Sequence, residues 1–275
     1  MPEAPDLEVI KEVLTRHILG WHVAEVRVVK PTVLRSLATQ DFSSHLTGRT
    51  VANVSRKGKF LFLTFSGDAI LAINPMLTGT IQLCEPGDRL YKRTCLVLAL
   101  GDDLELRYLD DRQMGKLYYV ATDQLDIVPG FNDQGPDALS DEIPFQEFKD
   151  RLRPYRGEIK GILTRGSFIA GIGNAYSDEI LFAAGISPFR KRTVLSEQEL
   201  ERLHRSSRQV LLDAVGVLRE RMGAEMHHKI RDFLQVHNKG GQPCPQCSST
   251  ISQLAANQRI ISFCRHCQPG MLIRN

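Results

Sequence analysis

Four of the six cysteines in this 275-residue chain are crowded into its last 32 residues. They form two pairs, CPQC (Cys244, Cys247) and CRHC (Cys264, Cys267), separated by 16 residues that alternate polar and apolar like a two-stranded hairpin. Two Cys-x-x-Cys knuckles at this spacing are typical of a tetrahedral, structural zinc site. Redox cysteines or disulfides are the alternative chemistry, and His266 is a competing ligand. We expect one structural Zn²⁺, whose binding folds a small module over residues 239–275.

The sequence pattern of the first part of the chain is typical of a β-sandwich. An amphipathic helix, PDLEVIKEVLTRHILG, comes first. Short segments rich in β-branched and aromatic residues then follow over about residues 21–121, separated by Gly, Asp, Asn and Pro turns. About eight antiparallel strands are predicted, in HVAEVRVV, TVANVSR, GKFLFLTF, AILAI, GTIQLC, TCLVLAL, LELRYL and KLYYV. Cys84 and Cys95 lie in two of these strands and are expected to be buried thiols.

Helical patterns dominate the rest of the chain. They lie in PFQEFKDRL, EIKGILTRG, NAYSDEILFAAG, a long stretch from Ser196 to about Met222, and HHKIRDFLQ. The predicted fold class is α+β, with an N-terminal helix and antiparallel β-sandwich (residues 1–125), a linker (126–143), a helical domain (144–238) and the cysteine module (239–275).

Charge is distributed unevenly along the chain. The first 150 residues carry 16 Lys/Arg and 22 Asp/Glu, and the remainder carries 19 and 10. A basic half suggests a polyanionic partner, although a well-solvated surface is the alternative. No apolar run approaches the ~20 residues of a membrane helix, and the N-terminus lacks the basic and apolar segments of a signal peptide. We therefore expect a soluble cytoplasmic protein without a membrane partner.

Two further motifs suit phosphate binding. In GIGNAYSDEILFAAGISP, Gly171, Gly173 and Asn174 open a helix whose positive N-terminus is a ready anion site, although a simple helix cap explains the same turn. At the expected tip of the hairpin, Asn257, Gln258 and Arg259 project a guanidinium suited to bidentate phosphate contact.

Together these motifs resemble the formamidopyrimidine-DNA glycosylase and endonuclease VIII family of base-excision repair enzymes. The resemblance covers nearly the whole chain: the N-terminal Pro-Glu, the β-sandwich, the helix–two-turn–helix around GIGNAYSDEILFAAGISP, and the four-cysteine finger. It implies a bifunctional DNA glycosylase and abasic-site lyase without a redox or nucleotide cofactor.

The resemblance also implies catalytic residues. Removal of Met1 leaves Pro2 as a free secondary amine, the nucleophile that forms a Schiff base with the sugar. Glu3 matches the carboxylate that transfers protons. Lys59 matches the phosphate-contacting strand lysine better than Lys57 does. Arg259 matches the finger arginine that grips the phosphates beside the lesion.

DNA-contacting residues follow from the same resemblance. Asn174 and Asn74 match positions that touch the DNA backbone, and Lys160 matches a further family lysine. Leu77 matches the wedge that fills the gap left by the flipped nucleotide, although a core leucine is the alternative. The segment DDRQMG places Arg112, Gln113 and Met114 where the family reads and intercalates opposite the lesion.

Three departures from the family pattern stand out. Gln113 and Met114 replace an Arg-Phe pair, which puts strict preference for an opposite cytosine in doubt. Asp6 replaces a glutamate. With a helix over HHKIRDFLQ, only residues 236–241 lie between helix and finger, too few for a lid over a flipped purine. We therefore expect oxidised pyrimidines to be favoured over 8-oxoguanine.

The leading hypothesis is thus a monomeric bacterial repair glycosylase that cuts damaged DNA by β,δ-elimination. A non-catalytic damaged-DNA-binding protein on the same scaffold is the alternative, and a zinc-ribbon transcription or RNA factor explains only the tail and the basic half.

Overall fold

The computed structural model describes residues 1–38, 41–140, 142–223, 226–256 and 259–270. The chain forms two compact units. Unit 1 contains residues 1–133 and 215–230, and unit 2 contains residues 134–214 and 231–275. Among the described helices, none has the length and apolar character needed to cross a membrane.

Unit 1 begins with helix α1 (Ala4–Ile18), as the apolar spacing predicts. Pro5 lies in the first turn, where a missing N–H costs no intrahelical hydrogen bond. The apolar face of α1 packs against strands β3 and β4, and Leu7, Ile10 and Leu14 are almost completely buried. The helix thereby fixes the N-terminal residues of the chain to the sandwich.

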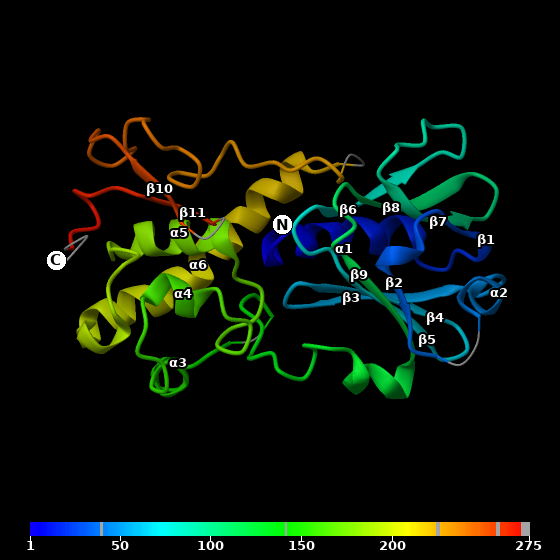
Figure 1. Cartoon of the computed structure of the whole chain (residues 1–275), viewed down its shortest axis with the longest axis horizontal. Helices are drawn as coiled ribbons and strands as arrows, with labels where there is room; N and C mark the ends of the chain where they lie inside the picture. The colour runs from blue at the N-terminus through cyan, green and yellow to red at the C-terminus, as the bar shows by residue number, and fades with distance from the viewer. Residues whose placement is uncertain (39–40, 141, 224–225, 257–258, 271–275) are drawn as a thin grey trace. The chain divides into compact units, whose positions relative to one another are not determined.

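Two sheets make up the sandwich (Figure 1). The first has the order β1-β7-β8-β6 and the second the order β2-β9-β5-β4-β3. The strands are β1 (Val23–Val28), β2 (Leu34–Ser36), β3 (Val51–Lys57), β4 (Phe60–Phe65), β5 (Ala69–Asn74), β6 (Gly79–Cys84), β7 (Thr94–Leu100), β8 (Leu104–Asp110) and β9 (Lys116–Ala121). All eight predicted strands are confirmed. The short β2, which pairs in parallel with β9, is additional.

The central strands β4, β5 and β9 of the second sheet are buried on both faces, which explains why they read as continuous apolar runs. Leu61, Leu63 and Phe65 point to the side opposite Phe60 and Phe62, because side chains alternate along β4. An apolar cluster on one face joins strands β4, β5 and β9 to Val128, with Leu125 and Phe131 packed against it. The start of the expected linker therefore covers this sheet. Of the two cysteines expected to be buried, Cys95 is buried and Cys84 is only partly so.

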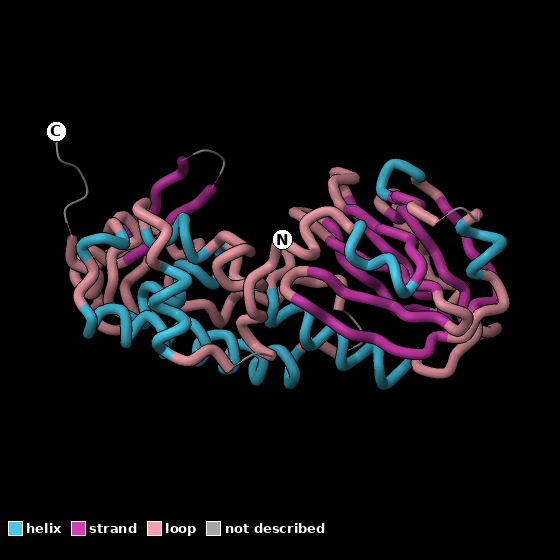
Figure 2. Tube along the Cα trace, turned by 90° about the horizontal axis from the view of Figure 1, so that it is seen from below, coloured by secondary structure: helices cyan, strands magenta, loops and turns pink. Residues whose placement is uncertain are grey.

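Unit 2 is mainly helical, and in Figure 2 helices and loops make up most of it, whereas strands dominate unit 1. Its helices are α3 (Phe145–Leu152), α4 (Ile159–Leu163), α5 (Asn174–Ala184) and most of α6 (Glu197–Arg221), which continues into unit 1. Short elements complete the chain: α2 (Phe42–Leu46), η1 (Pro31–Val33), η2 (Thr122–Ile127) and η3 (Arg192–Val194). Helices α3 to α6 confirm four predicted helices.

The last module is the predicted hairpin between the two cysteine pairs. Strand β10 (Ser252–Ala256) pairs antiparallel with β11 (Arg259–Phe263). Strand β11 packs against α5 (Figure 1), and Phe182 of α5 joins Val236, Ile251 and two of the cysteines in one apolar cluster. The finger is therefore anchored on the helix of the GIGN motif.

The helix predicted over HHKIRDFLQ is wrong. The described residues from 226 to 238 form turns and irregular chain. The physical reason lies in Glu179, whose carboxylate accepts hydrogen bonds from the backbone N–H groups of Gln235, Val236 and His237. These donors are directed at one buried carboxylate and not along a helix axis. Helix α6 ends at Arg221, so residues 222–243 all lie between it and Cys244. The premise of a short lid segment is therefore also wrong.

Candidate active site

Pro2 and Glu3 lie directly before α1, and both are buried. Glu3 is the N-cap residue, with extended backbone angles. Its backbone N–H donates to the Asp6 carboxylate at 2.8 Å, as in a capping box. Asp6, although shorter than the glutamate of the family pattern, thus holds the N-terminal residues at the start of the helix.

Lys59 lies in the two-residue turn between β3 and β4. Gly58 precedes it with φ of 57°, the left-handed conformation that favours glycine at the first central position of such a turn. Lys57, the competing lysine, places its Nζ 4.9 Å from the centre of the Phe131 ring. This cation–π contact gives Lys57 a partner within unit 1.

Leu77 lies in the turn between β5 and β6, with 43% of its surface exposed. The Asn74 side chain shapes this turn, because its Oδ1 accepts a hydrogen bond from the Met76 N–H at 3.2 Å. Met76 has φ of 48°, which a non-glycine residue adopts only when its surroundings hold it there. Leu77 is therefore an exposed tip and not a core residue.

Arg112, Gln113 and Met114 form the exposed turn between β8 and β9. Gln113 has φ of 51°, and its Oε1 accepts a hydrogen bond from the Thr32 hydroxyl. Met114 is 39% exposed. The turn thus presents one amide and one flexible apolar side chain to solvent.

Asn174 is the first residue of α5, and Gly173 is the N-cap residue, so Asn174 does not cap the helix. The Asn174 Nδ2 donates to the Ile260 carbonyl at 2.8 Å. Its Oδ1 is buried and finds no hydrogen-bond donor among the described residues. Asn174 therefore ties the N-terminus of α5 to the hairpin strand that follows Arg259.

Lys160 is 6% exposed and reaches the same strand. Its Nζ lies 2.5 Å from Asp178 Oδ1 and 3.0 Å from the Ile260 carbonyl oxygen. Asp178 Oδ2 in turn contacts His237 Nδ1 at 2.7 Å and the Ser262 N–H at 3.2 Å. Lys160 thus helps to fix strand β11 to helix α5 through a buried ion pair.

Neither Asp178 nor Glu179 was given a role from the sequence, although both lie in the GIGNAYSDEILFAAGISP motif. Both are buried in α5, and together they bind the finger strand and the segment before the finger. Burial raises the pKa of Glu179, while hydrogen bonds from His237, Gln235 and Val236 offset part of this effect. Two adjacent acids in an otherwise apolar helix are the signal that could have revealed them, because buried carboxylates need partners.

Arg259 begins strand β11, paired with Ala256. Asn257 and Gln258, the remainder of the expected tip, lie outside the described residues, and the structure describes only the backbone of Arg259. The hairpin that carries Arg259 is thus confirmed.

The four cysteine Sγ atoms lie within 4.8 Å of one another. Contacts between pairs are 3.8 Å for Cys244–Cys267 and 3.5 Å for Cys247–Cys264. A tetrahedral zinc site with Zn–S bonds of ~2.3 Å has S–S edges of about 3.8 Å, and a disulfide has an S–S bond of about 2.05 Å. The cluster therefore fits one metal ion and excludes disulfides. His266 is exposed and is not a member of the cluster.

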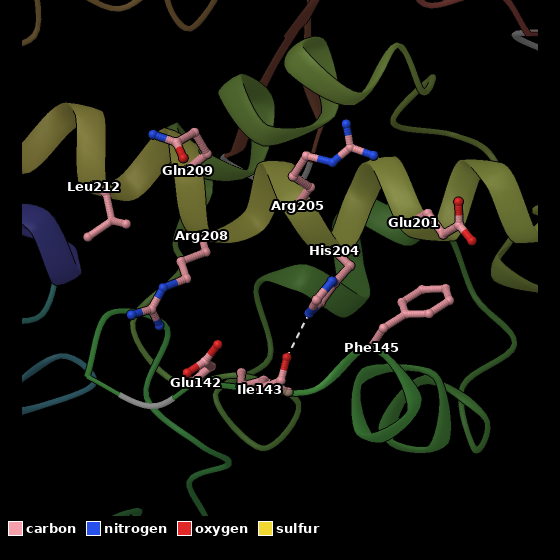
Figure 3. Close-up of a pocket in the computed structure, with 9 residues that line it drawn as sticks. All are labelled: Glu142, Ile143, Phe145, Glu201, His204, Arg205, Arg208, Gln209 and Leu212. Atoms are coloured by element: carbon pink, nitrogen blue, oxygen red, sulfur yellow. Dashed lines mark hydrogen bonds between the residues drawn. The ribbon is translucent and has the colours of Figure 1, made fainter.

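A cavity of about 550 Å³ lies elsewhere in unit 2, beside α6 (Figure 3). In Figure 3 the His204 ring reaches across to the Ile143 carbonyl oxygen, at 2.7 Å. None of the predicted site residues lines this cavity.

The predicted residues divide between the two units. Unit 1 carries the N-terminal pair, Lys59 and the two exposed turns, and unit 2 carries the metal cluster and the residues around β11. In unit 2, Lys160 and Asn174 meet at the Ile260 carbonyl oxygen, and the four cysteines form one cluster.

Two family models match the chain. The model of the formamidopyrimidine-DNA glycosylase N-terminal domain matches residues 1–117, and that of the formamidopyrimidine-DNA glycosylase H2TH domain matches residues 134–228.

Curated formamidopyrimidine-DNA glycosylases match this chain over nearly its full length. The formamidopyrimidine-DNA glycosylase of Pelotomaculum thermopropionicum is 31% identical and covers 98% of this chain and 99% of its own. The formamidopyrimidine-DNA glycosylase of Symbiobacterium thermophilum is 33% identical and covers 98% of this chain and 90% of its own. Among solved structures, Lactococcus lactis Fpg in complex with abasic-site DNA matches with a TM-score of 0.88 at 27% identity, covering 98% of this chain and 100% of its own. A mutant of the same enzyme in complex with Fapy-dG DNA matches with a TM-score of 0.86, at the same identity and coverage.

Proposed function

The chain belongs to the formamidopyrimidine-DNA glycosylase family of DNA repair enzymes, and from this premise we propose that it removes oxidised bases through its N-terminal proline. The observation that carries the proposal is the buried Pro2-Glu3 pair, fixed at the start of α1 by the hydrogen bond between Glu3 and Asp6. After Met1 is removed, the Pro2 nitrogen is an α-amine. Such an amine titrates near ~8, so a useful fraction is unprotonated at neutral pH.

In the proposed reaction, the Pro2 nitrogen attacks C1′ of the damaged nucleotide. The C1′–N bond breaks, and the base leaves with its electron pair and takes up a proton. Glu3 protonates the ring oxygen, so that the sugar opens and a cationic Schiff base forms between Pro2 and C1′. Loss of a C2′ proton then expels the 3′ phosphate, and a second elimination expels the 5′ phosphate. Hydrolysis of the Schiff base finally frees the enzyme.

Phosphate contacts position the DNA in this proposal. Lys59, Asn74, Asn174 and Arg259 supply donors from a tight turn, a strand end, a helix N-terminus and the finger hairpin. Lys160, which is held in its ion pair with Asp178, acts by fixing the strand that follows Arg259.

The metal in the finger is proposed to be one Zn²⁺, held by Cys244, Cys247, Cys264 and Cys267. Binding of a divalent ion by these four thiols requires their thiolate form, so metal binding would release protons. A four-thiolate shell leaves no open position for substrate, and the ion therefore serves the fold.

The preferred lesion is also a proposal. Because residues 222–243 all lie between α6 and Cys244, the argument from a short segment no longer supports the expected preference for pyrimidines over 8-oxoguanine. The Lactococcus lactis relative was solved with Fapy-dG DNA, a ring-opened purine. We propose that this chain accepts oxidised purines as well as pyrimidines, acting as a monomer on DNA in the bacterial cytoplasm.

Borohydride trapping tests the proposal. Full-length protein is incubated with duplexes that carry an abasic site, 8-oxoguanine, Fapy-dG or dihydrouracil, and borohydride reduces any Schiff base to a stable amine. We expect a covalent adduct whose peptide map places the DNA on Pro2. Mass spectrometry of the intact protein should show that Met1 is absent.

A protein in which Met1 is retained is the matched control, because its Pro2 nitrogen is an amide. It should bind lesion DNA and form no adduct. An adduct on another residue, or none with any lesion, would contradict the proposal, and the second result would favour a non-catalytic damaged-DNA-binding protein.

A further inference from the structure

Two turns of unit 1 carry exposed apolar tips of the same design. Leu77 follows Met76, and Met114 follows Gln113. Met76 and Gln113 both have positive φ although neither is glycine, at 48° and 51°. Such conformations cost free energy and persist only where surrounding contacts fix the backbone. A common support for the two turns is therefore expected.

Asp110, at the end of β8, is that support. It is completely buried, with 0% of its surface exposed. Its Oδ1 accepts a hydrogen bond from the Thr78 hydroxyl, in the Leu77 turn, and another from the Arg112 N–H at 3.2 Å. Its Oδ2 accepts from the Gly115 N–H at 2.7 Å. One carboxylate thus binds the residue after Leu77 and the residues on both sides of Gln113 and Met114.

The two turns are also joined directly. The Arg112 N–H lies 3.3 Å from the Thr78 hydroxyl oxygen, so Thr78, Asp110 and Arg112 form a closed triangle of hydrogen bonds. In the ladder between β6 and β8, Gly79 pairs with Asp110, which sets the register of this triangle.

Tyr108 leaves no room for the turns to move inward. Its hydroxyl lies 3.4 Å from Asp110 Oδ2. A Cβ atom at Gly79 would lie 2.0 Å from this hydroxyl oxygen, and one at Gly115 would lie 1.7 Å from it. The glycines therefore allow both turns to close on the same buried phenol, and the packing resists displacement of either one.

We propose that Asp110 is a positioning residue that holds the Leu77 and Met114 turns as one body, so that both side chains enter the duplex together when a nucleotide is flipped out. This inference rests on the proposed function, which assigns both tips to the DNA. Insertion of the Leu77 and Met114 side chains into the duplex exerts a force on both turns. Because the two turns share one buried acceptor, this force is transmitted to the sheet. Asp110 itself touches neither the sugar nor the base.

The substitution Asp110→Asn tests this role, because an amide keeps the shape but cannot accept at both oxygens. On duplexes with an abasic site we expect kcat/KM to fall about tenfold or more, as for the loss of one or two buried hydrogen bonds. On the same oligonucleotide in single-stranded form, where no stack needs to be opened, the rate should change less than about threefold. Asp111→Asn, the same change at an exposed neighbour, should keep the ratio of duplex to single-strand rates.

A second pair of variants covers the case in which Asp110→Asn does not fold. Thr78→Val removes only the hydroxyl donor, and Thr78→Ser restores it. We expect Thr78→Val to lower the duplex rate selectively and Thr78→Ser to rescue it.

Insertion can also be measured without chemistry. 2-Aminopurine opposite a tetrahydrofuran abasic analogue reports unstacking by a rise in fluorescence, and this analogue forms no Schiff base. Parent protein should give the rise, and Thr78→Val should reduce it at saturating protein. If the parent gives the rise but no trapped adduct on any lesion, the Pro2 mechanism fails while the inference stands. If the variants lower duplex and single-strand rates equally, or leave the fluorescence rise unchanged, the inference is overturned.

Discussion

Arg56 Nε lies 2.6 Å from Glu8 Oε2, and Arg56 also donates to the Gly58 carbonyl oxygen at 3.0 Å. The Arg56 side chain is fully buried. One guanidinium therefore joins α1, which begins next to Pro2 and Glu3, to the turn that carries Lys59. The proposed nucleophile and the proposed phosphate contact lie on elements held together by this pair.

Glu8→Ala should destabilise unit 1 by about 3 kcal/mol, since removing one partner of a largely buried ion pair leaves the other charge uncompensated. Urea unfolding followed by the fluorescence of Trp21, the single tryptophan, measures the loss. Glu12→Ala is the matched control in the same helix, because Glu12 pairs with the exposed Arg219 and should cost less than about 1 kcal/mol. An equal decrease in the free energy of unfolding for the two variants would show that the buried ion pair stabilises unit 1 no more than the exposed one.

Unit 1 should lose stability in acid partly through Glu8. Although burial alone raises the pKa of Glu8, hydrogen bonds from Lys11 and Arg56 lower it overall below its ordinary value. A carboxyl whose folded pKa is lowered contributes stability above its unfolded pKa, and this contribution is lost as the pH falls through the folded pKa. The free energy of unfolding should therefore decline below pH ~4.5, less steeply in Glu8→Gln than in the parent. Parallel curves for parent and variant would contradict this assignment.

Lys59→Ala should lower the rate of strand cleavage about 10- to 100-fold, as expected for the loss of a charge-assisted contact to phosphate. Lys57→Ala should change it less than about threefold, because Lys57 already contacts the Phe131 ring. Single-turnover cleavage of abasic duplexes compares the two. A larger effect at Lys57 would reverse the choice between these lysines.

Removal of the finger metal should abolish tight binding to lesion DNA and leave unit 1 folded, because the four cysteines all belong to unit 2. Metal analysis should find one zinc per chain. After chelation, Trp21 fluorescence should keep its native spectrum while DNA binding falls, and added Zn²⁺ should restore binding. Full binding by metal-free protein would separate the cluster from DNA recognition.

Gln113→Arg should sharpen the choice of the base opposite the lesion. A guanidinium offers a fixed fork of donors, whereas the amide of Gln113, already bonded to the Thr32 hydroxyl, offers one donor group. The ratio of kcat/KM for cytosine over adenine opposite an abasic site should rise about tenfold. Gln113→Lys is the control, because it adds the positive charge without the planar set of guanidinium donors. An unchanged ratio would show that this turn does not read the opposite base.

Much of the fold could be predicted because local patterns and tertiary packing agree. Alternating or continuous apolar runs located the eight strands, and cysteine spacing located the hairpin. The helix predicted over HHKIRDFLQ is wrong because its apolar spacing competes with the carboxylate of Glu179, some 56 residues away from Gln235. Propensity carries no information about such a distant acceptor.

The candidate site shows the same division. Pro2, Glu3, Lys59, Leu77 and Arg259 were predicted through the resemblance to a known family. Asp110, Asp178 and Glu179 were not predicted as site residues, because what marks each is its buried contacts, which sequence spacing does not express. The helix error also entered the functional prediction, because it shortened the expected segment before the finger and so favoured oxidised pyrimidines over 8-oxoguanine as substrates.

The carboxylate of Glu179 holds its segment by main-chain N–H groups alone. Substitutions at Gln235, Val236 or His237 therefore leave this anchor intact, whichever side chain they introduce, with one exception. Proline at any of the three positions removes a donor. The side chain of Gln235 can therefore vary without affecting this anchor. Val236, which packs in the apolar cluster, and His237, whose Nδ1 contacts Asp178, are also restricted in their side chains, and Glu179 itself has little freedom to change.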